Sequence, residues 1–135
     1  MIEYTTSLDD VTPDQLEGFF VGWPSPPSQR KHLELLEGSA HAVLAKDGAR
    51  VVGFVTAISD GVLSAYVPLL EVLPEYQRRG IGTELVRRLL DRVANLYMVD
   101  VICDEDVVPF YERFGLQRLD AALGVRNRSV LSGGH

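Results

Sequence analysis

The sequence predicts a mixed α/β fold in which helices cover both faces of a central sheet of six or seven strands. Two hairpin turns, at Asp47-Gly48 and Asp60-Gly61, join three segments that are rich in apolar residues. A strand-like segment, a Gly-rich turn and an amphipathic helix then follow one another without a break over residues 62–93. This order of elements is typical of a sheet that is packed by helices on both sides.

The first forty residues are expected to form one strand and two short helices. Residues 2–7 alternate polar and apolar side chains and predict a short strand. Asp9 or Thr12 could cap a first helix, whose inner face would carry the apolar side chains of residues 16–20. Residues 29–37 predict a second short helix. The prolines of the intervening segment, which contains Trp23, predict a stiff loop because proline fixes φ and removes a donor.

The middle of the chain carries the clearest periodicity. Strands are expected over residues 41–46, 51–59 and 62–72. The helix that follows has a continuous apolar stripe at the spacing of an α-helix. That stripe is formed by Ile81, Leu85, Leu89 and Val93, widened by Val86 and Leu90.

The last forty residues are expected to complete the sheet. Residues 97–103 predict a buried strand that includes Cys103, and residues 107–114 predict a helix that Gly115 ends. The segments 116–119 and 123–127 could form a last pair of strands. Residues 132–135 are expected to be a frayed tail.

Length, charge and cysteine content limit the function classes. At 135 residues the chain is expected to be one domain over residues 1–135. A formal net charge of −6 argues against non-specific nucleic-acid binding. The single Cys103 excludes an internal disulfide, and neither a signal peptide nor a membrane span is visible, so a cytoplasmic location without membrane attachment is expected.

Two glycines and two arginines meet where the predicted strand 62–72 gives way to the helix. Gly80 and Gly82 lack a Cβ, so their backbone can approach a ligand closely. The first N–H groups of a helix have no intrahelical partner and attract anions, and Arg78 and Arg79 add two full charges there. The segment is therefore predicted to bind a pyrophosphate, and Arg87, Arg88 and Arg92 extend the basic cluster.

These residues resemble a known family, the GNAT superfamily of acyl-CoA-dependent N-acyltransferases. Its signature Q/R-x-x-G-x-G/A is similar to Gln77-Arg78-Arg79-Gly80-Ile81-Gly82, and residues 109–116 resemble its F-Y-x-x-x-G-F block. The resemblance covers roughly residues 40–120. It implies a mostly antiparallel central sheet and an N-acetyltransferase that moves an acetyl group from acetyl-CoA to an amine by direct attack in a ternary complex.

The resemblance also implies where the co-substrate binds. The strand before the glycines would hold the pantetheine arm, and the turn would hold the pyrophosphate. The residues concerned would be Leu70, Val72, Gln77, Arg78, Arg79, Gly80, Ile81, Gly82 and Thr83. Pro68 fits this picture because proline marks an edge or a bulge, although it could equally belong to an edge strand that avoids aggregation. An N–H near Leu70 would stabilise an oxyanion, an effect of roughly 3 kcal/mol.

Two residues are candidates for proton transfer. By the resemblance, Tyr111 would protonate the departing thiolate; otherwise it is a core aromatic residue. The fifth-strand glutamate that some family members use as base is replaced by Val99, which leaves Glu71 as the leading substitute. The weaker options are Asp100, Asp104, Tyr66 and a chain of water molecules. The Asn that often precedes the tyrosine by seven residues in this family is Asp104 here, so a cofactor contact there is in doubt.

Several alternatives stay open at this point. The missing glutamate also fits a non-catalytic acyl-CoA-binding or sensor module on the same fold. No metal site is expected, because His32, His41 and Cys103 lack the spacing of metal ligands. The loop at Trp23 could close over the acceptor or only anchor the indole ring. A homodimer is an open option, since exposed terminal strands in such folds often pair between subunits.

Overall fold

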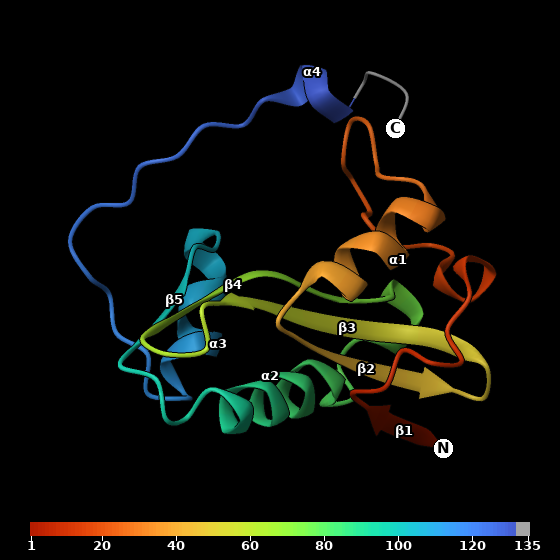
Figure 1. The fold of residues 1–135 in the computed structure, drawn as a ribbon, viewed down its shortest axis with the longest axis horizontal. Coiled ribbons are helices and arrows are strands. Elements are labelled where there is room, and N and C mark those ends of the chain that lie inside the picture. The colour runs from red at the N-terminus through yellow and green to blue at the C-terminus, as the bar shows by residue number, and fades with distance from the viewer. Residues whose placement is uncertain (132–135) are drawn as a thin grey trace.

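The computed structural model describes residues 1–131, which form one five-stranded sheet with helices on both faces (Figure 1). The strands are β1 (Ile2–Thr5), β2 (His41–Asp47), β3 (Arg50–Ser59), β4 (Ser64–Val72) and β5 (Met98–Val101). The helices are α1 (Gln29–Gly38), α2 (Ile81–Arg92), α3 (Val108–Glu112) and α4 (Arg128–Leu131), with 3-10 turns at Pro13–Leu16, Pro74–Tyr76 and Glu105–Val107. The strands lie side by side in chain order; β1 to β4 are antiparallel, and β5 is parallel to β4.

The two faces of the sheet are distinguished by neighbouring residues of β3. Gly53 faces α2: a Cβ at this position would lie 3.1 Å from Leu85 Cδ1 and 3.3 Å from Ile81 Cγ2. The absence of a side chain therefore lets α2 pack closely on the sheet. Phe54 points to the opposite face, where its ring lies 4.4 Å from the ring of His32 on α1, centroid to centroid. In Figure 1, α1 and α2 accordingly lie on opposite sides of the sheet.

Both predicted hairpins are present, and the second begins its strand later than expected. Asp60 Oδ1 accepts the backbone N–H groups of Val62, Leu63 and Ser64 at 2.9, 2.9 and 3.2 Å. These three bonds hold the residues after the turn in a loop, so β4 begins at Ser64 and not at residue 62. They also lower the pKa of the Asp60 carboxyl, with the Leu63 bond contributing most.

The prediction of six or seven strands is wrong, because the sheet in residues 1–131 has five. The segments 116–119 and 123–127 form no strand there, and their apolar side chains lie in solvent: Leu119 is 78% exposed and Leu123 is 95% exposed. Figure 1 shows this part of the chain leading away from the sheet to α4. The local pattern suits a strand, but no strand edge lies beside it.

Two further expectations for local structure need correction. The predicted first helix is only the 3-10 turn Pro13–Leu16, because the chain turns sharply at Gly18 and Phe20, where φ is 97° and 63°. Phe20 nevertheless reaches the core. Cys103 is exposed and follows β5, so it is not a buried strand residue. The tail expected over residues 132–135 lies outside the described residues.

Candidate active site

The centre of the candidate site is the second half of β4, which pairs on one side only. β5 pairs with β4 from Ser64–Met98 to Val67–Val101, and the ladder stops immediately before Pro68. On its other side β4 stays paired with β3 as far as Val72, which lies opposite Gly53. The two parallel strands thus separate at Pro68. Residues 68–72 keep a free edge.

The register shows which backbone groups face that free edge. Leu73 N–H donates to Val52 O at 2.9 Å, so this pair of opposite residues is a hydrogen-bonded one. In an antiparallel ladder such pairs alternate with pairs whose polar groups point outward. The N–H and C=O groups of Leu70 and Val72 therefore point away from β3, toward the free edge. Pro68 lies where the β3–β4 register shifts, between the pairs Thr56–Leu69 and Ile58–Tyr66, and proline, which has no N–H to donate, is tolerated at such a bulge.

The turn from β4 into α2 has the geometry of an anion cradle. Arg78 and Gly80 have positive φ values of 66° and 80°, whereas Arg79 between them does not. Such alternation turns successive N–H groups toward one side of the chain and forms an anion-binding concavity. Gly80 is the N-cap of α2 and offers no side chain to the first N–H groups, and a Cβ at Gly80 would meet nothing within 4 Å. The start of this helix is therefore open to a ligand.

The side chains around the cradle differ in the groups that they contact. Gln77 Nε2 donates to Val72 O at 3.0 Å and so occupies one of the outward groups of β4. Arg79 donates to Glu75 O at 3.2 Å, and its guanidinium lies 5.0 Å from the centre of the Tyr76 ring. Arg78 is exposed and has no hydrogen bond or ion pair within residues 1–131. Of the two arginines predicted to bind the pyrophosphate, Arg78 is thus the one whose charge no other residue occupies among residues 1–131.

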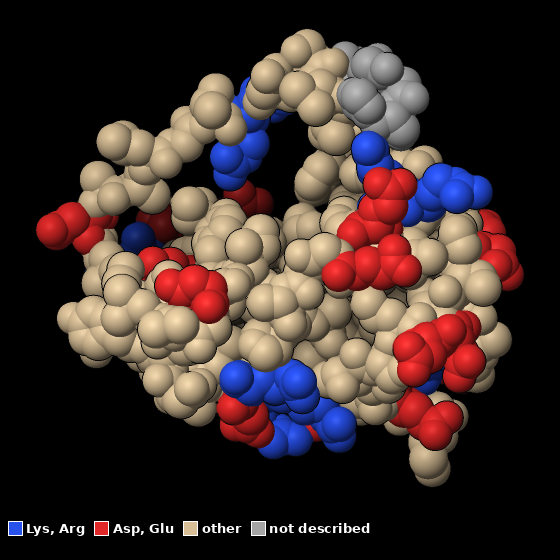
Figure 2. Space-filling view, in the orientation of Figure 1, with Lys and Arg blue, Asp and Glu red and all other residues tan. Residues whose placement is uncertain are grey.

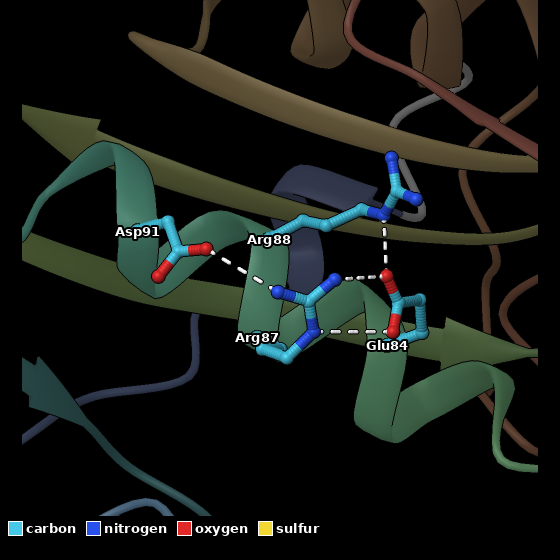
Figure 3. A network of polar contacts seen from close by, with 4 residues as sticks. All are labelled: Glu84, Arg87, Arg88 and Asp91. Atoms are coloured by element: carbon cyan, nitrogen blue, oxygen red, sulfur yellow. Dashed lines mark hydrogen bonds and ion pairs between the residues drawn. The ribbon is translucent and has the colours of Figure 1, made fainter.

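The other arginines of α2 do not belong to the cradle, which corrects the expectation of one basic cluster. Figure 3 shows Glu84 between Arg87 and Arg88, with Asp91 on the far side of Arg87. Arg88 Nε donates to Glu84 Oε2 at 2.6 Å, and Arg87 Nε donates to Glu84 Oε1 at 3.2 Å. The hydrogen bond from Arg87, followed by that from Arg88, lowers the pKa of Glu84 to about 2. In Figure 2 these basic groups and their acidic partners gather over α2 on the outer surface.

A cavity of about 300 Å³ lies where β4 and β5 separate, on the face of the sheet that carries Phe54. We call it the β4–β5 pocket. It is lined by Trp23, Phe54, Pro68, Leu69, Leu70, Glu71, Ile102, Cys103 and Asp104. Its lining residues include two carboxylates and an indole ring but no basic residue. Trp23 therefore reaches the site from the proline loop. This position is required by the interpretation in which the loop closes over the acceptor.

Glu71 holds the loop that brings Trp23 to the pocket. Its Oε1 accepts the N–H of Phe20 at 2.9 Å, and its Oε2 accepts the N–H of Val21 at 3.2 Å. The ring of Phe20 in turn lies 5.0 Å from the ring of Trp23. Glu71 is a candidate from the sequence, but this contact is not visible there, because its partners are main-chain groups some fifty residues away.

Tyr111, on α3, is buried, and its phenol interacts with Cys103, which follows β5. Burial raises the pKa of its phenol to about 12, with a smaller contribution from Cys103, which lines the pocket. The hydroxyl is therefore protonated throughout the physiological pH range. The neighbouring Phe110 connects α3 to the cradle, since a Cβ at Gly82 would lie 3.8 Å from Val72 Cγ2 and 4.0 Å from Phe110 Cζ.

A comparison with known proteins identifies the family. The sequence profile of the Acetyltransferase (GNAT) family matches residues 8–116 of this chain. The chain belongs to the GNAT acetyltransferase family. The expectation taken from the signature of residues 77–82 is thus confirmed at the level of the family.

Individual GNAT relatives agree with this assignment. A crystal structure from Deinococcus radiodurans R1, provisionally named an acetyltransferase, superimposes with a TM-score of 0.91 at 49% identity and covers 95% of this chain and 90% of that one. An uncharacterized N-acetyltransferase of Pyropia yezoensis is 28% identical over 100 residues, which are 70% of this chain and 58% of that protein. GCN5-related N-acetyltransferase 3, chloroplastic, of Arabidopsis thaliana is 36% identical over 74 residues, 53% of this chain and 31% of that protein. The chain therefore spans less than two thirds of the length of each of these two relatives.

GNAT acetyltransferases use acetyl-CoA as co-substrate, and the residues of this chain fit such a molecule. The open start of α2 suits a pyrophosphate, and the free edge at Leu70 and Val72 suits an extended amide chain. Within residues 1–131, no group of three or more His, Cys, Asp and Glu side chains could hold a metal ion. No helix in the same range is long and apolar enough to cross a membrane.

Proposed function

We propose that this chain is an N-acetyltransferase that transfers an acetyl group from acetyl-CoA to an amine by direct attack in a ternary complex. The observation that carries the proposal is the free half of β4. Leu70 lies there between the cradle on the α2 face and the β4–β5 pocket on the α1 face. The two substrates would approach the same backbone segment from opposite faces of the sheet.

The residues proposed for the co-substrate are those of the strand end and the turn. Leu70 C=O and Val72 N–H would bond the amide groups of pantetheine, because Val72 C=O already accepts from Gln77. The first N–H groups of α2 and the Arg78 guanidinium would bind the pyrophosphate. Acetyl-CoA supplies an activated thioester carbon, and the Leu70 N–H would stabilise negative charge on its oxygen.

Proton transfers are assigned to the two candidates found in the sequence. A new N–C bond forms as the C–S bond breaks, so the amine loses a proton and the leaving sulfur gains one. Tyr111 is the proposed donor to sulfur, since its phenol carries its proton at neutral pH. Glu71, in the pocket wall, is the proposed acceptor of the amine proton, either directly or through water.

One observation favours a second candidate, an acyl-CoA-binding module without turnover. Both carboxylate oxygens of Glu71 already accept loop N–H groups, and Val99 stands where some relatives carry a glutamate. This arrangement would leave the binding of acetyl-CoA intact while no side chain removes the amine proton.

A thiol-release assay with acetyl-CoA and a panel of amines separates the two candidates. We expect release of free CoA with at least one amine, together with heat of CoA binding in titration calorimetry. Binding without release for any amine would support the module without turnover. Absence of binding would refute both.

A further inference from the structure

The β4–β5 pocket, where the proposed amine would meet the thioester, has acidic and aromatic walls. Glu71 lies on β4 and Asp104 follows β5, so the two carboxylates come from the two strands that separate at this point. Trp23 and Phe54 supply the aromatic surfaces. Walls of this composition attract a positively charged ligand and repel an anionic one.

The two carboxylates of the pocket differ in their partners. Both oxygens of Glu71 accept backbone N–H groups of the loop, at 2.9 and 3.2 Å. The carboxylate of Asp104 caps no N–H group of the 3-10 turn that follows it, and it makes no hydrogen bond or ion pair within residues 1–131. Glu71 therefore has a structural role already, whereas the charge of Asp104 is available to a ligand.

The negative charge of Asp104 reaches the wall of the pocket. Burial raises the pKa of the Cys103 thiol in that wall, and Asp104 makes the next largest contribution in the same direction, followed after Arg118 by Glu105 and Asp106. The charge of Arg118 opposes this effect, but its guanidinium is paired with Glu105 at 2.8 Å. One cation thus faces three carboxylates, and this end of the pocket is negative.

The volume of the pocket limits the size of its ligand. The cavity measures about 300 Å³, which is the lower end of the range for small-molecule sites. A water molecule occupies about 30 Å³ in the liquid, so the cavity holds roughly ten groups of that size. This volume fits a short aliphatic chain with a charged group at each end, and it does not enclose a bulky ring system.

We propose that the amine acceptor is a short aliphatic diamine and that Asp104 binds the ammonium group at the end remote from the reaction. This inference rests on the proposed acetyl transfer. The reacting nitrogen would lie on the Glu71 side of the pocket, near Leu70. The Asp104 carboxylate would accept a charge-assisted hydrogen bond from the remote ammonium, and the indole of Trp23 would stabilise the same cation through its π face. Asp104 would then serve the acceptor and not the cofactor.

The first test compares acceptors that differ in the charge at the remote end. Putrescine and pentylamine have chains of the same length that end in an ammonium and a methyl group, and γ-aminobutyrate ends in a carboxylate. We expect kcat/KM for putrescine to be about tenfold higher than for pentylamine, with γ-aminobutyrate lowest, and the preference to decrease at high salt. Equal values for putrescine and pentylamine, or faster acetylation of a peptide lysine than of putrescine, would overturn the proposal.

The second test assigns the preference to Asp104. Asp104→Asn should lower kcat/KM for putrescine about tenfold, mostly through KM, while kcat/KM for pentylamine and the Kd for CoA stay the same. Asp106→Asn is the matched control, because Asp106 is exposed and does not line the pocket. An equal loss with both amines would make Asp104 a general base, and weaker CoA binding would place it at the cofactor. Either result would refute the proposal.

The third test measures binding without turnover, and so it separates this proposal from acetyl transfer itself. Trp23 is the only tryptophan of the sequence and lines the pocket. Putrescine added to the complex with CoA should change the Trp23 fluorescence to saturation, with a Kd about tenfold lower than that of pentylamine. Asp104→Asn should remove this difference.

The outcomes of the binding and kinetic tests distinguish two failures. If putrescine binds with this preference but no amine is acetylated, the proposed function fails and the assignment of the pocket to a diamine stands. If amines are acetylated without a preference for a second positive charge, only the present inference fails.

Discussion

The two faces of the sheet offer different groups at the candidate site. On the α2 face, the backbone around Gly80 presents N–H groups that the chain leaves unoccupied. On the α1 face, Glu71 closes a loop over the sheet and uses both of its oxygens to do so. Beneath that loop lies a cluster formed by His32, Phe19, Phe20 and Phe54.

This difference suggests that the α2 face determines the affinity for CoA and the α1 face determines which amine is accepted. The α2 face binds through main-chain groups whose positions follow from helix and turn geometry, so many sequences with the same glycines can build it. The α1 face is built from side chains that hold one particular loop. We therefore expect substitutions on the α2 face to change CoA affinity and substitutions on the α1 face to change stability and the choice of amine.

The largest effect is expected on the α1 face, at His32. This side chain is 1% exposed, and neither ring nitrogen has a hydrogen-bond partner in the described structure. Burial lowers the pKa of its imidazole from 6.5 to about 4. The folded state therefore resists protonation, and the free energy of unfolding should fall by about 3 kcal/mol as the pH drops from 6.5 to 4. Above pH 6.5 this contribution is fully present.

Urea denaturation at several pH values tests the role of His32. His32→Leu should remove that part of the pH dependence while keeping or raising the stability at pH 7, since it replaces an unsatisfied polar ring by an apolar side chain. His41→Gln is the control, because His41 is only partly buried and accepts a hydrogen bond from Arg92 at 3.3 Å. An unchanged pH dependence in His32→Leu would show that another group dominates acid unfolding.

The next effect concerns Tyr111, the proton donor proposed for the leaving sulfur. Tyr111→Phe should lower kcat by about 100-fold if the phenol protonates the leaving sulfur, with the Kd for CoA unchanged. Tyr97→Phe is the matched control, because Tyr97 is 85% exposed. Since the pKa of Tyr111 is about 12, wild-type kcat should show no loss from this group between pH 7 and 10. Equal kcat in both variants would assign Tyr111 to the core alone.

Substitution of Glu71 tests whether this residue acts on the α1 face by holding the loop or as a general base. If Glu71 chiefly holds residues 20 and 21, Glu71→Gln should raise the KM for the amine by about tenfold and leave kcat within a few-fold. A general base behaves differently: kcat should then fall by about 100-fold. Steady-state kinetics over a range of amine concentrations distinguishes the two results, and unchanged KM and kcat would remove Glu71 from the site.

The sequence predicted the α2 face much better than the α1 face. Gly80, Gly82 and Arg78 are neighbours in the chain, so a local pattern describes their geometry. The link from Glu71 to the Phe20 N–H and the closeness of His32 to Phe54 depend on tertiary packing, which no local pattern contains. Residues 116–127 show the opposite error: alternation predicted strands there, but a strand also needs a neighbouring edge, and the described chain offers none beside them.

On the α2 face, Gly80→Ala should weaken CoA binding by about tenfold, because the added methyl group points into the open space of the cradle and strains a left-handed residue. Gly48 offers a matched control: its φ is also positive, at 64°, and a Cβ there likewise meets nothing within 4 Å. Both variants should lose about 1 kcal/mol of stability. Titration calorimetry should show weaker binding for Gly80→Ala alone, and equal affinities would contradict the cradle.

The smallest effect compares two arginines of the α2 face that differ in their partners. Arg78 has no ion pair among the described residues, whereas Arg88 is held by Glu84 at 2.6 Å on the outer side of the helix. Arg78→Ala should therefore raise the Kd for CoA by about threefold at low salt, and by less at high salt because an exposed charge is screened. Arg88→Ala should leave that Kd unchanged and cost less than about 1 kcal/mol of stability. A larger loss of CoA affinity in Arg88→Ala than in Arg78→Ala would place the pyrophosphate along the outer surface of α2 and not at its first turn.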